Sequence, residues 1–180
     1  RLRADARWRK LGDGWQLQAP RLNLKQGEKT SRLDGLLVEG GSRFHLQGRE
    51  LDLSPLAAML ALSDKLPDGL RLFLLQSNPQ AVLRDVAISG RRNGSLRGSL
   101  RIEQLALQPY GQRPGLSGVA GRIRFDEYGG VLRLDSTPVR LDWPVALRAP
   151  EELRLQGSVA AWRDGAGGWQ KLRWVTLPTI

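Results

Sequence analysis

Strict alternation of apolar and polar residues is the feature that most constrains this chain. It opens with RLRADARWR, in which Leu2, Ala4, Ala6 and Trp8 are each flanked by arginine or aspartate. Successive side chains of a β-strand point to opposite faces, so this pattern gives a strand one apolar and one charged face. The alternation recurs in WQLQA, RLNLK, RFHLQ, LRGSLRIEQ, VAGRIRFDE, VLRLDS, VRLDWP and LRLQGSV. The sequence therefore predicts a mainly β protein.

Glycine-rich turn signals separate these segments. They lie at Gly12–Gly14, Gly40–Gly41, Asn93–Gly94, Tyr128–Gly130 and Gly165–Gly168. Short connections of this kind join neighbouring antiparallel strands. We expect a long curved antiparallel sheet, built as a meander of about ten amphipathic strands.

Residues 54–78 break the alternation and are predicted to form a short helical hairpin inserted into the sheet. Ser54 is expected to be the N-cap of the first helix, with Pro55 at its first position. A second helix is expected from about Asp68 to Gln76, and Asn78-Pro79 should end it. The side chains expected to face inward are Leu56, Met59 and Leu60 on the first helix and Leu70, Phe73 and Leu74 on the second.

One phrase occurs near both ends of the chain. ARWRKLGDGWQ at residues 6–16 and AAWRDGAGGWQ at residues 160–170 share Ala, Trp, Arg, Gly, Trp and Gln at a constant offset. Each phrase is typical of a β-hairpin with a glycine-rich turn. Either the likeness is coincidental, or a further repeat unit begins at about residue 157.

An amphipathic sheet must cover its apolar face, and the sequence leaves two ways open. A closed protein would use a second sheet or curl into a barrel. Alternatively, the sheet forms an open gutter whose apolar lining holds an apolar guest. The expected helices are too short to cover so many strands. Both arrangements require the same alternation, so periodicity does not separate them.

Charge and composition narrow the expected partners. The chain has 28 Lys and Arg against 18 Asp and Glu, a net charge of +10, and no cysteine. Its arginines are spread singly along the strands, with no basic run and no recognition-helix pattern, so nucleic acid is not an expected partner. No apolar run reaches the length of a membrane span. Arg1 lies inside a strand pattern, so we expect a segment of a longer protein.

The residues do not assemble into a catalytic or metal site. His45 is the single histidine, and without cysteine it cannot complete a zinc site or a Ser-His-Asp arrangement. Carboxylates are interleaved with arginine and are expected to form cross-strand ion pairs. Asp126 and Glu127 lead into a turn. No catalytic residue, metal or cofactor is predicted, and the chain is not expected to be an enzyme.

Three longer segments carry a family resemblance. LQPYGQRPGLSGVAGRIRFDEYGGVLRLDS at 107–136, with LDLSPLAAMLALSDKLPDGLRLFLL at 51–75, resembles the large AsmA-like envelope proteins of Gram-negative bacteria, specifically their YhdP branch. The continuation VRLDWPVALRAPEELRLQGSVAAWRDGAGGW is similar to the same region. PYGQRPGLSG is the most specific phrase, and the resemblance covers roughly residues 50–170.

The resemblance implies one segment, residues 1–180, of a larger periplasmic β-groove that is anchored in the inner membrane by a helix outside this sequence. Such proteins are implicated in bridge-like lipid transfer, carrying phospholipid between the inner and outer membranes to maintain the envelope. Expected partners are phospholipid acyl chains, the rest of the same longer chain, the inner membrane, and an outer-membrane or periplasmic protein. The alternative is a closed β-sandwich that serves as a scaffold or protein-interaction module in the envelope.

Apolar residues of the alternating segments are the candidates for the groove lining. A lipid tail needs a continuous apolar surface, because each exposed methylene costs about 0.8 kcal/mol. The candidates are Trp8, Trp15, Leu17, Leu22, Phe44, Leu46, Leu100, Ile102, Ile123, Phe125, Leu132, Leu134, Leu141, Trp143, Leu153 and Leu155.

Overall fold

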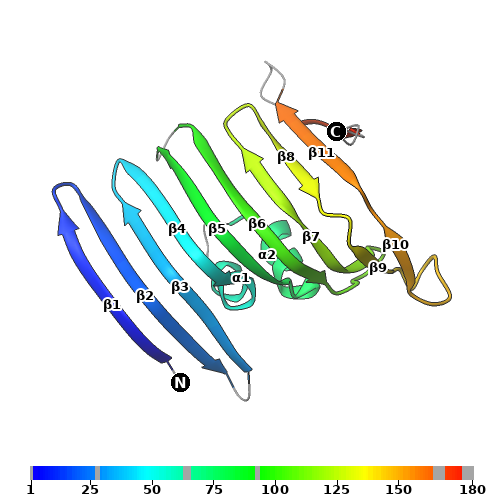
Figure 1. The fold of residues 1–180 in the computed structure, drawn as a ribbon, viewed down its shortest axis with the longest axis horizontal. Coiled ribbons are helices and arrows are strands. Elements are labelled where there is room, and N and C mark those ends of the chain that lie inside the picture. Colours follow the sequence, from blue (N-terminus) through cyan, green and yellow to red (C-terminus); the bar gives the residue numbers. More distant parts are fainter. Residues whose placement is uncertain (1, 27–28, 63–65, 92–93, 164–168, 176–180) are drawn as a thin grey trace.

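The alternating segments form one antiparallel β-sheet accompanied by two short helices, which confirms the predicted fold class (Figure 1). The computed structural model describes residues 2–26, 29–62, 66–91, 94–163 and 169–175. In these residues the elements are β1 (Leu2–Leu11), β2 (Gly14–Gln26), β3 (Lys29–Gly40), β4 (Arg43–Asp52), α1 (Leu53–Ala61), α2 (Asp68–Ser77), β5 (Gln80–Arg91), β6 (Leu96–Leu107), β7 (Gly115–Phe125), β8 (Gly129–Leu134), β9 (Pro138–Asp142), β10 (Glu151–Arg154), β11 (Gly157–Arg163) and β12 (Trp169–Val175).

The sheet is a meander with two free edges. Strands β1 to β8 pair in sequence order, and β11 and β12 continue from β8. β9 takes over the pairing with β7 beyond the end of β8, and β10 pairs with β9. Among the described residues β1 pairs only with β2, and β12 only with β11, so these strands form opposite edges. The closed β-sandwich is therefore not the arrangement of this part of the chain.

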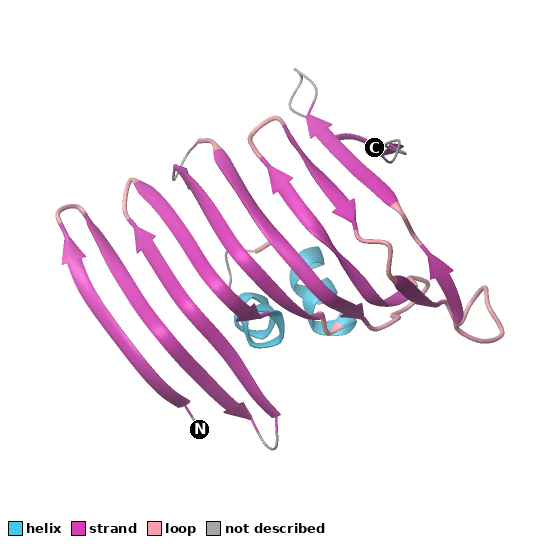
Figure 2. Ribbon diagram, viewed as in Figure 1, coloured by secondary structure: helices cyan, strands magenta, loops and turns pink. Residues whose placement is uncertain are grey.

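A line of β-bulges crosses the sheet and bends it. In β2, Ala19 and Pro20 together oppose Ala6 of β1, which makes one of them an extra residue, and in β5, Asp85 and Val86 likewise oppose Leu100 of β6. Along this line Gly35 in β3 and Asp85 in β5 have positive φ. The register places Pro20 beside Gly35, and Arg49 of β4 beside Asp85. A bulge bends its strand and increases the local twist. The strands accordingly bow along their length (Figure 2).

The buried core lies on one face of this bend. Its fully buried members include Leu33 and Leu51, which are 2% and 1% exposed. Leu56 of α1 packs against the same cluster, so the helices lie over this apolar face near one end of the strands. The complete cluster of buried residues is Ala19, Leu33, Leu36, Leu51 and Val86.

The helices differ from the sequence prediction at two points. The N-cap of α1 is Asp52, whose carboxylate accepts a hydrogen bond from the Ser54 N–H at 2.9 Å, so the prediction of Ser54 was wrong. The predicted inward faces were also partly wrong, because Met59 and Leu60 of α1 and Leu70 of α2 are exposed, while Ala57 and Ala61 are buried. Small residues allow α1 to approach its neighbours closely. The predicted end of α2 is confirmed, since Asn78 is a left-handed C-cap.

The two similar phrases lie in antiparallel strand pairs at opposite edges of the sheet. β1 and β2 pair through Arg9 opposite Gln16, whereas β11 and β12 pair through Arg163 opposite Trp169. The registers therefore differ by one residue around the shared phrase. The turn at Gly165–Gly168 lies outside the described residues. A repeat unit starting at about residue 157 stays a prediction.

Candidate functional site

Three rows of apolar residues run across one face of the sheet, perpendicular to the strands. Residues paired directly across antiparallel strands share a face, so the register defines each row. The first row contains Trp8, Leu17, Val38, Leu46, Ile88, Gly98, Phe125 and Gly130. The second runs through Ala19 and Leu36 and continues with Leu100, Ile123, Leu132 and Val159. The third contains Leu22, Leu33, Leu51, Leu83, Ile102, Gly121, Leu134 and Gly157.

This apolar face is covered unevenly. Beneath α1 its residues are buried, whereas Ile123, Phe125, Leu132 and Leu134 on β7 and β8 are only half-buried. At the β1 edge Trp8 is 64% exposed. A core closed by a second layer would bury all of these side chains. The face is therefore an apolar surface that is open over much of its area.

The register brings most of the predicted lining residues together. Those on the apolar face of the main sheet are Trp8, Trp15, Leu17, Leu22, Phe44, Leu46, Leu100, Ile102, Ile123, Phe125, Leu132 and Leu134. Leu141 and Leu153 lie on the small β9–β10 extension. Trp143 follows β9 and donates its indole N–H to the Gln112 carbonyl at 3.0 Å, and Leu155 lies between β10 and β11. Contact with lipid stays a prediction for each of them.

Sequence reasoning missed the centre of this face. Leu33 and Leu36 in β3, like Leu83 and Val86 in β5, are three residues apart and yet share a face. The bulges at Gly35 and Asp85 each insert a residue and reset the alternation. A search for period two passes over such pairs. The available signal was two apolar residues separated by an Asp-Gly or an Arg-Asp pair.

Aromatic side chains on the apolar face lie against glycines of the next strand. A Cβ atom added at Gly98 would lie 2.9 Å from Cζ of Phe125, and one added at Gly90 would lie 2.7 Å from Cε1 of Phe44. Trp15 covers Gly40 in the same way. These rings occupy the space that a neighbouring side chain would fill, as in aromatic rescue of strand glycines. They therefore lie along the sheet and leave the space above it free.

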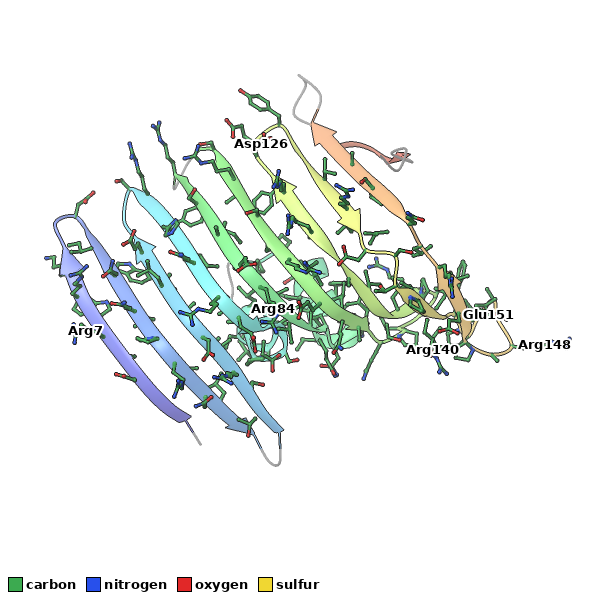
Figure 3. All side chains as sticks on the ribbon, in the orientation of Figure 1. Arg7, Arg84, Asp126, Arg140, Arg148 and Glu151 are labelled. Carbon is green, nitrogen blue, oxygen red and sulfur yellow. The ribbon has the colours of Figure 1, made fainter. Side chains whose placement is uncertain are left out.

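The opposite face carries charge. One row contains, in order across β3 to β8, Asp34, Glu50, Arg84, Arg101, Arg122 and Arg133. Arg84 lies 2.8 Å from Glu50 and 2.7 Å from Glu103, while Arg101 lies 3.2 Å from Asp135. The hydrogen bond and charge of Glu103, followed by the charge of Glu50, raise the pKa of Arg84. Arg7 and Arg84, labelled in Figure 3, belong to this charged face. The predicted cross-strand ion pairs are thus present.

An open sheet with one apolar and one charged face agrees with the family resemblance of the sequence. A family model described as YhdP protein matches residues 1–173. The chain belongs to the YhdP family. No curated protein and no solved structure matches it. In the described part of this YhdP-family chain, no helix is long and apolar enough to cross a membrane. Those residues also contain no group of His, Asp and Glu suited to a metal ion.

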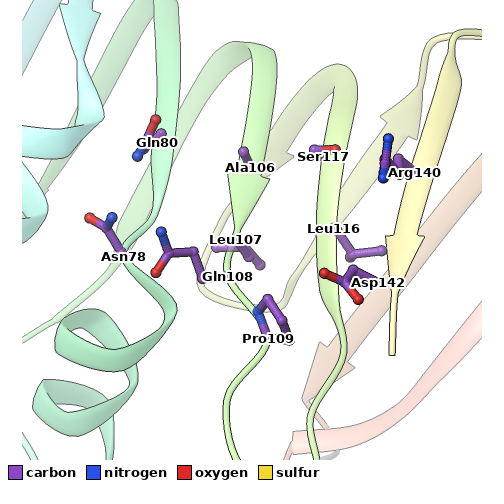
Figure 4. Close-up of a pocket in the computed structure, with 10 residues that line it drawn as sticks. All are labelled: Asn78, Gln80, Ala106, Leu107, Gln108, Pro109, Leu116, Ser117, Arg140 and Asp142. Atoms are coloured by element: carbon purple, nitrogen blue, oxygen red, sulfur yellow. The ribbon is translucent and has the colours of Figure 1, made fainter. Parts of the chain in front are cut away.

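Two pockets of this YhdP-family chain lie at the strand ends nearest the helices. The one in Figure 4 has a volume of about 260 Å³ and a mixed lining, in which Gln80, Arg140 and Asp142 lie beside Leu107 and Leu116. That is below the range of about 300–1,000 Å³ usual for small-molecule sites. A larger opening of about 830 Å³ lies between α1 and the sheet, where Pro55 and Leu24 contribute to its walls. Neither pocket is enclosed by apolar side chains, so the open face is the better candidate for an apolar ligand.

Proposed function

We propose that this chain guides phospholipid acyl chains along the apolar face of its sheet. It would act as one segment of a periplasmic groove that is anchored in the inner membrane and carries phospholipid toward the outer membrane. The observation that supports the proposal is the continuity of the three apolar rows. From β2 to β8 no charged side chain interrupts them.

The dimensions of the face suit a lipid tail. Each row spans eight neighbouring strands, and at about 4.8 Å per strand it is about 34 Å long. The hydrocarbon core of a whole bilayer is about 30 Å thick, so the tails of one leaflet need about half of that. A lipid could therefore keep its tails on apolar surface throughout a step from one strand to the next.

The energetics favour a continuous surface over a series of separate sites. Fifteen methylenes exposed to water would cost about 12 kcal/mol, at about 0.8 kcal/mol each. An unbroken apolar face removes most of this cost at every position, so movement along it meets no large barrier. The phosphate headgroup can stay in water at the open side. No cofactor and no catalytic step is required.

Photocrosslinking in the full-length protein within its native envelope tests this function. A photoreactive residue replaces Phe125 or Leu134 on the apolar face, and Arg124 or Arg133 serves as the control one position away on the charged face. We expect phospholipid adducts, detected by mass spectrometry, at the first two positions and only background at the controls. Protein adducts alone at Phe125 and Leu134, or equal lipid labelling of both faces, would refute the proposal.

A further inference from the structure

A separate concave site lies mainly on the charged face, where β4 and β6 begin and β5 ends. Its volume is about 780 Å³, and Arg43, Arg91 and Arg97 from the three strands line it. Ser89 and Ser95 add hydroxyl groups. Glu39, His45 and Ser89 also line it from the charged face, and Phe44 and Gly90 contribute from the apolar face. The site therefore lies mainly on the charged face, at the end of these strands.

Positive charge is concentrated at this arginine pocket, defined by Arg43, Arg91 and Arg97. Arg43 and Arg91 are paired directly across β4 and β5, an arrangement in which like charges destabilise a sheet. The ion pairs within the described part of the chain include none of the three arginines. Arg97 places its Nε 3.5 Å from the Ser89 hydroxyl. Among the residues described, the guanidinium groups are thus gathered without a carboxylate in ion-pair contact with them.

The one carboxylate in the lining is engaged elsewhere. Glu39 accepts a hydrogen bond from the side-chain amide of Gln16 at 2.5 Å, and the same Gln16 accepts one from Nε of Arg9 at 2.7 Å. This chain of contacts runs from β3 toward β1, away from β5 and β6. Glu39 therefore offers little compensation to Arg91 and Arg97.

We propose that the arginine pocket binds a phosphate-bearing anion, either a phosphate ester in solution or the phosphodiester of a lipid headgroup. Guanidinium forks pair with phosphate oxygens through two parallel charge-assisted hydrogen bonds. A bridging anion would also remove the repulsion between Arg43 and Arg91. The volume is within the range of small-molecule sites. The site does not rest on the proposed function, because its arginines lie on the charged face of the sheet.

Calorimetric titration of the full chain tests the pocket, with inorganic phosphate and monomeric dihexanoylphosphatidylglycerol as the two probes. The double variant Arg43→Gln with Arg91→Gln should lower the affinity roughly tenfold, since it removes two charge-assisted partners. The matched control is Arg122→Gln with Arg133→Gln, which removes the same charge from another directly opposed pair on the same face. Its affinity should change by less than about twofold, as expected for exposed charges away from the ligand.

The two probes distinguish the sources of the phosphate. Similar affinities for both would assign the pocket to phosphate esters in general, and saturable binding of the lipid alone would assign it to a headgroup. Arg97→Lys, which keeps the charge but not the fork, gives a second measurement if the double variant is unfolded. Equal losses in the Arg122/Arg133 control, or no saturable binding of either probe, would overturn the proposal. Labelling at Phe125 is an independent readout of the acyl-chain path.

Discussion

At the scale of single residues, Leu51 illustrates how the apolar face is stabilised. It lies at the end of β4, opposite Leu33 and Leu83, and is 1% exposed. Leu37, by contrast, is half-buried on the charged face, opposite Gln18 and Gln47. Both are leucines in the middle of the sheet. Leu51 lies on the apolar face, in the cluster against which Leu56 of α1 packs, whereas Leu37 lies on the charged face.

We expect Leu51→Ala to lower the free energy of unfolding by about 2–5 kcal/mol, because it leaves a cavity in the core. Leu37→Ala should cost about 1 kcal/mol or less, the value for partial burial of a few methylenes. Urea unfolding followed by tryptophan fluorescence measures both. Equal losses would contradict the assignment of the faces.

The sequence predicted those site residues that follow the two-residue period of a regular strand. Phe125, Leu132 and Leu134 follow period two, so the alternation placed them on the correct face. Leu33 and Val86 lie next to bulges, where an inserted residue shifts the period, and the prediction omitted them. Pairing between strands decides which residue is extra. That information is not contained in one strand alone.

At the scale of elements, the bulge line is the device that curves the sheet. Asp85 has φ of 50°, a left-handed conformation that costs most side chains about 1–2 kcal/mol and that aspartate and asparagine tolerate best. Arg49 of β4 lies beside Asp85. On its other side, Arg49 lies beside Gly35 of β3, which has φ of 65°. The aligned bulges therefore depend on residues that accept this backbone.

Asp85→Val should destabilise the chain by about 1–3 kcal/mol, because a β-branched side chain is strained at positive φ. Asp85→Asn should stay within about 0.5 kcal/mol of the parent, since asparagine also adopts this conformation. The matched control is Ala87→Val, an exposed position on the same strand. Chemical unfolding reports all three, and a loss for valine at 87 as large as at 85 would argue against backbone strain.

The two helices show which helix ends can be predicted from the local sequence alone. The end of α2 at Asn78 was predictable, because Asn-Pro stops a helix by its own chemistry. The start of α1 was not predictable, since Asp52 and Ser54 are both favourable N-cap residues. The point at which β4 ends determines which of the two caps the helix. The buried side of α1, with Ala57 and Ala61, depends on how closely the helix approaches its neighbours. Periodicity favoured the larger side chains instead.

At the scale of the whole molecule, openness is the property that the sequence could not decide. Alternation predicts one apolar face for a sandwich, a barrel or a gutter alike. Strand order settles it for the described residues, because a meander in which β1 and β12 each pair on one side only is not closed and has no second sheet over it. Half-buried Ile123 and Leu132 in the middle of the sheet are the consequence. Contiguous apolar surface of this kind marks a binding site or an aggregation hazard.

An open face should bind an apolar dye in the native state. The dye must be neutral, because a chain of net charge +10 would attract an anionic probe to its arginines. We expect the folded chain to enhance Nile red fluorescence, and Ile123→Asn with Leu132→Asn, a directly opposed pair on the apolar face, to remove most of the signal. Arg122→Asn with Arg133→Asn, the adjacent pair on the charged face, should leave it nearly unchanged.

Urea distinguishes a native open face from a loosened core. Dye bound to an open face is released as the sheet unfolds, so its fluorescence should fall in the same transition as the tryptophan signal. A closed core would give little fluorescence in the native state and a maximum at intermediate urea, where packing is lost but collapse persists. That second outcome would mean that the apolar rows are covered in solution, and a lipid would then have no surface along which to move.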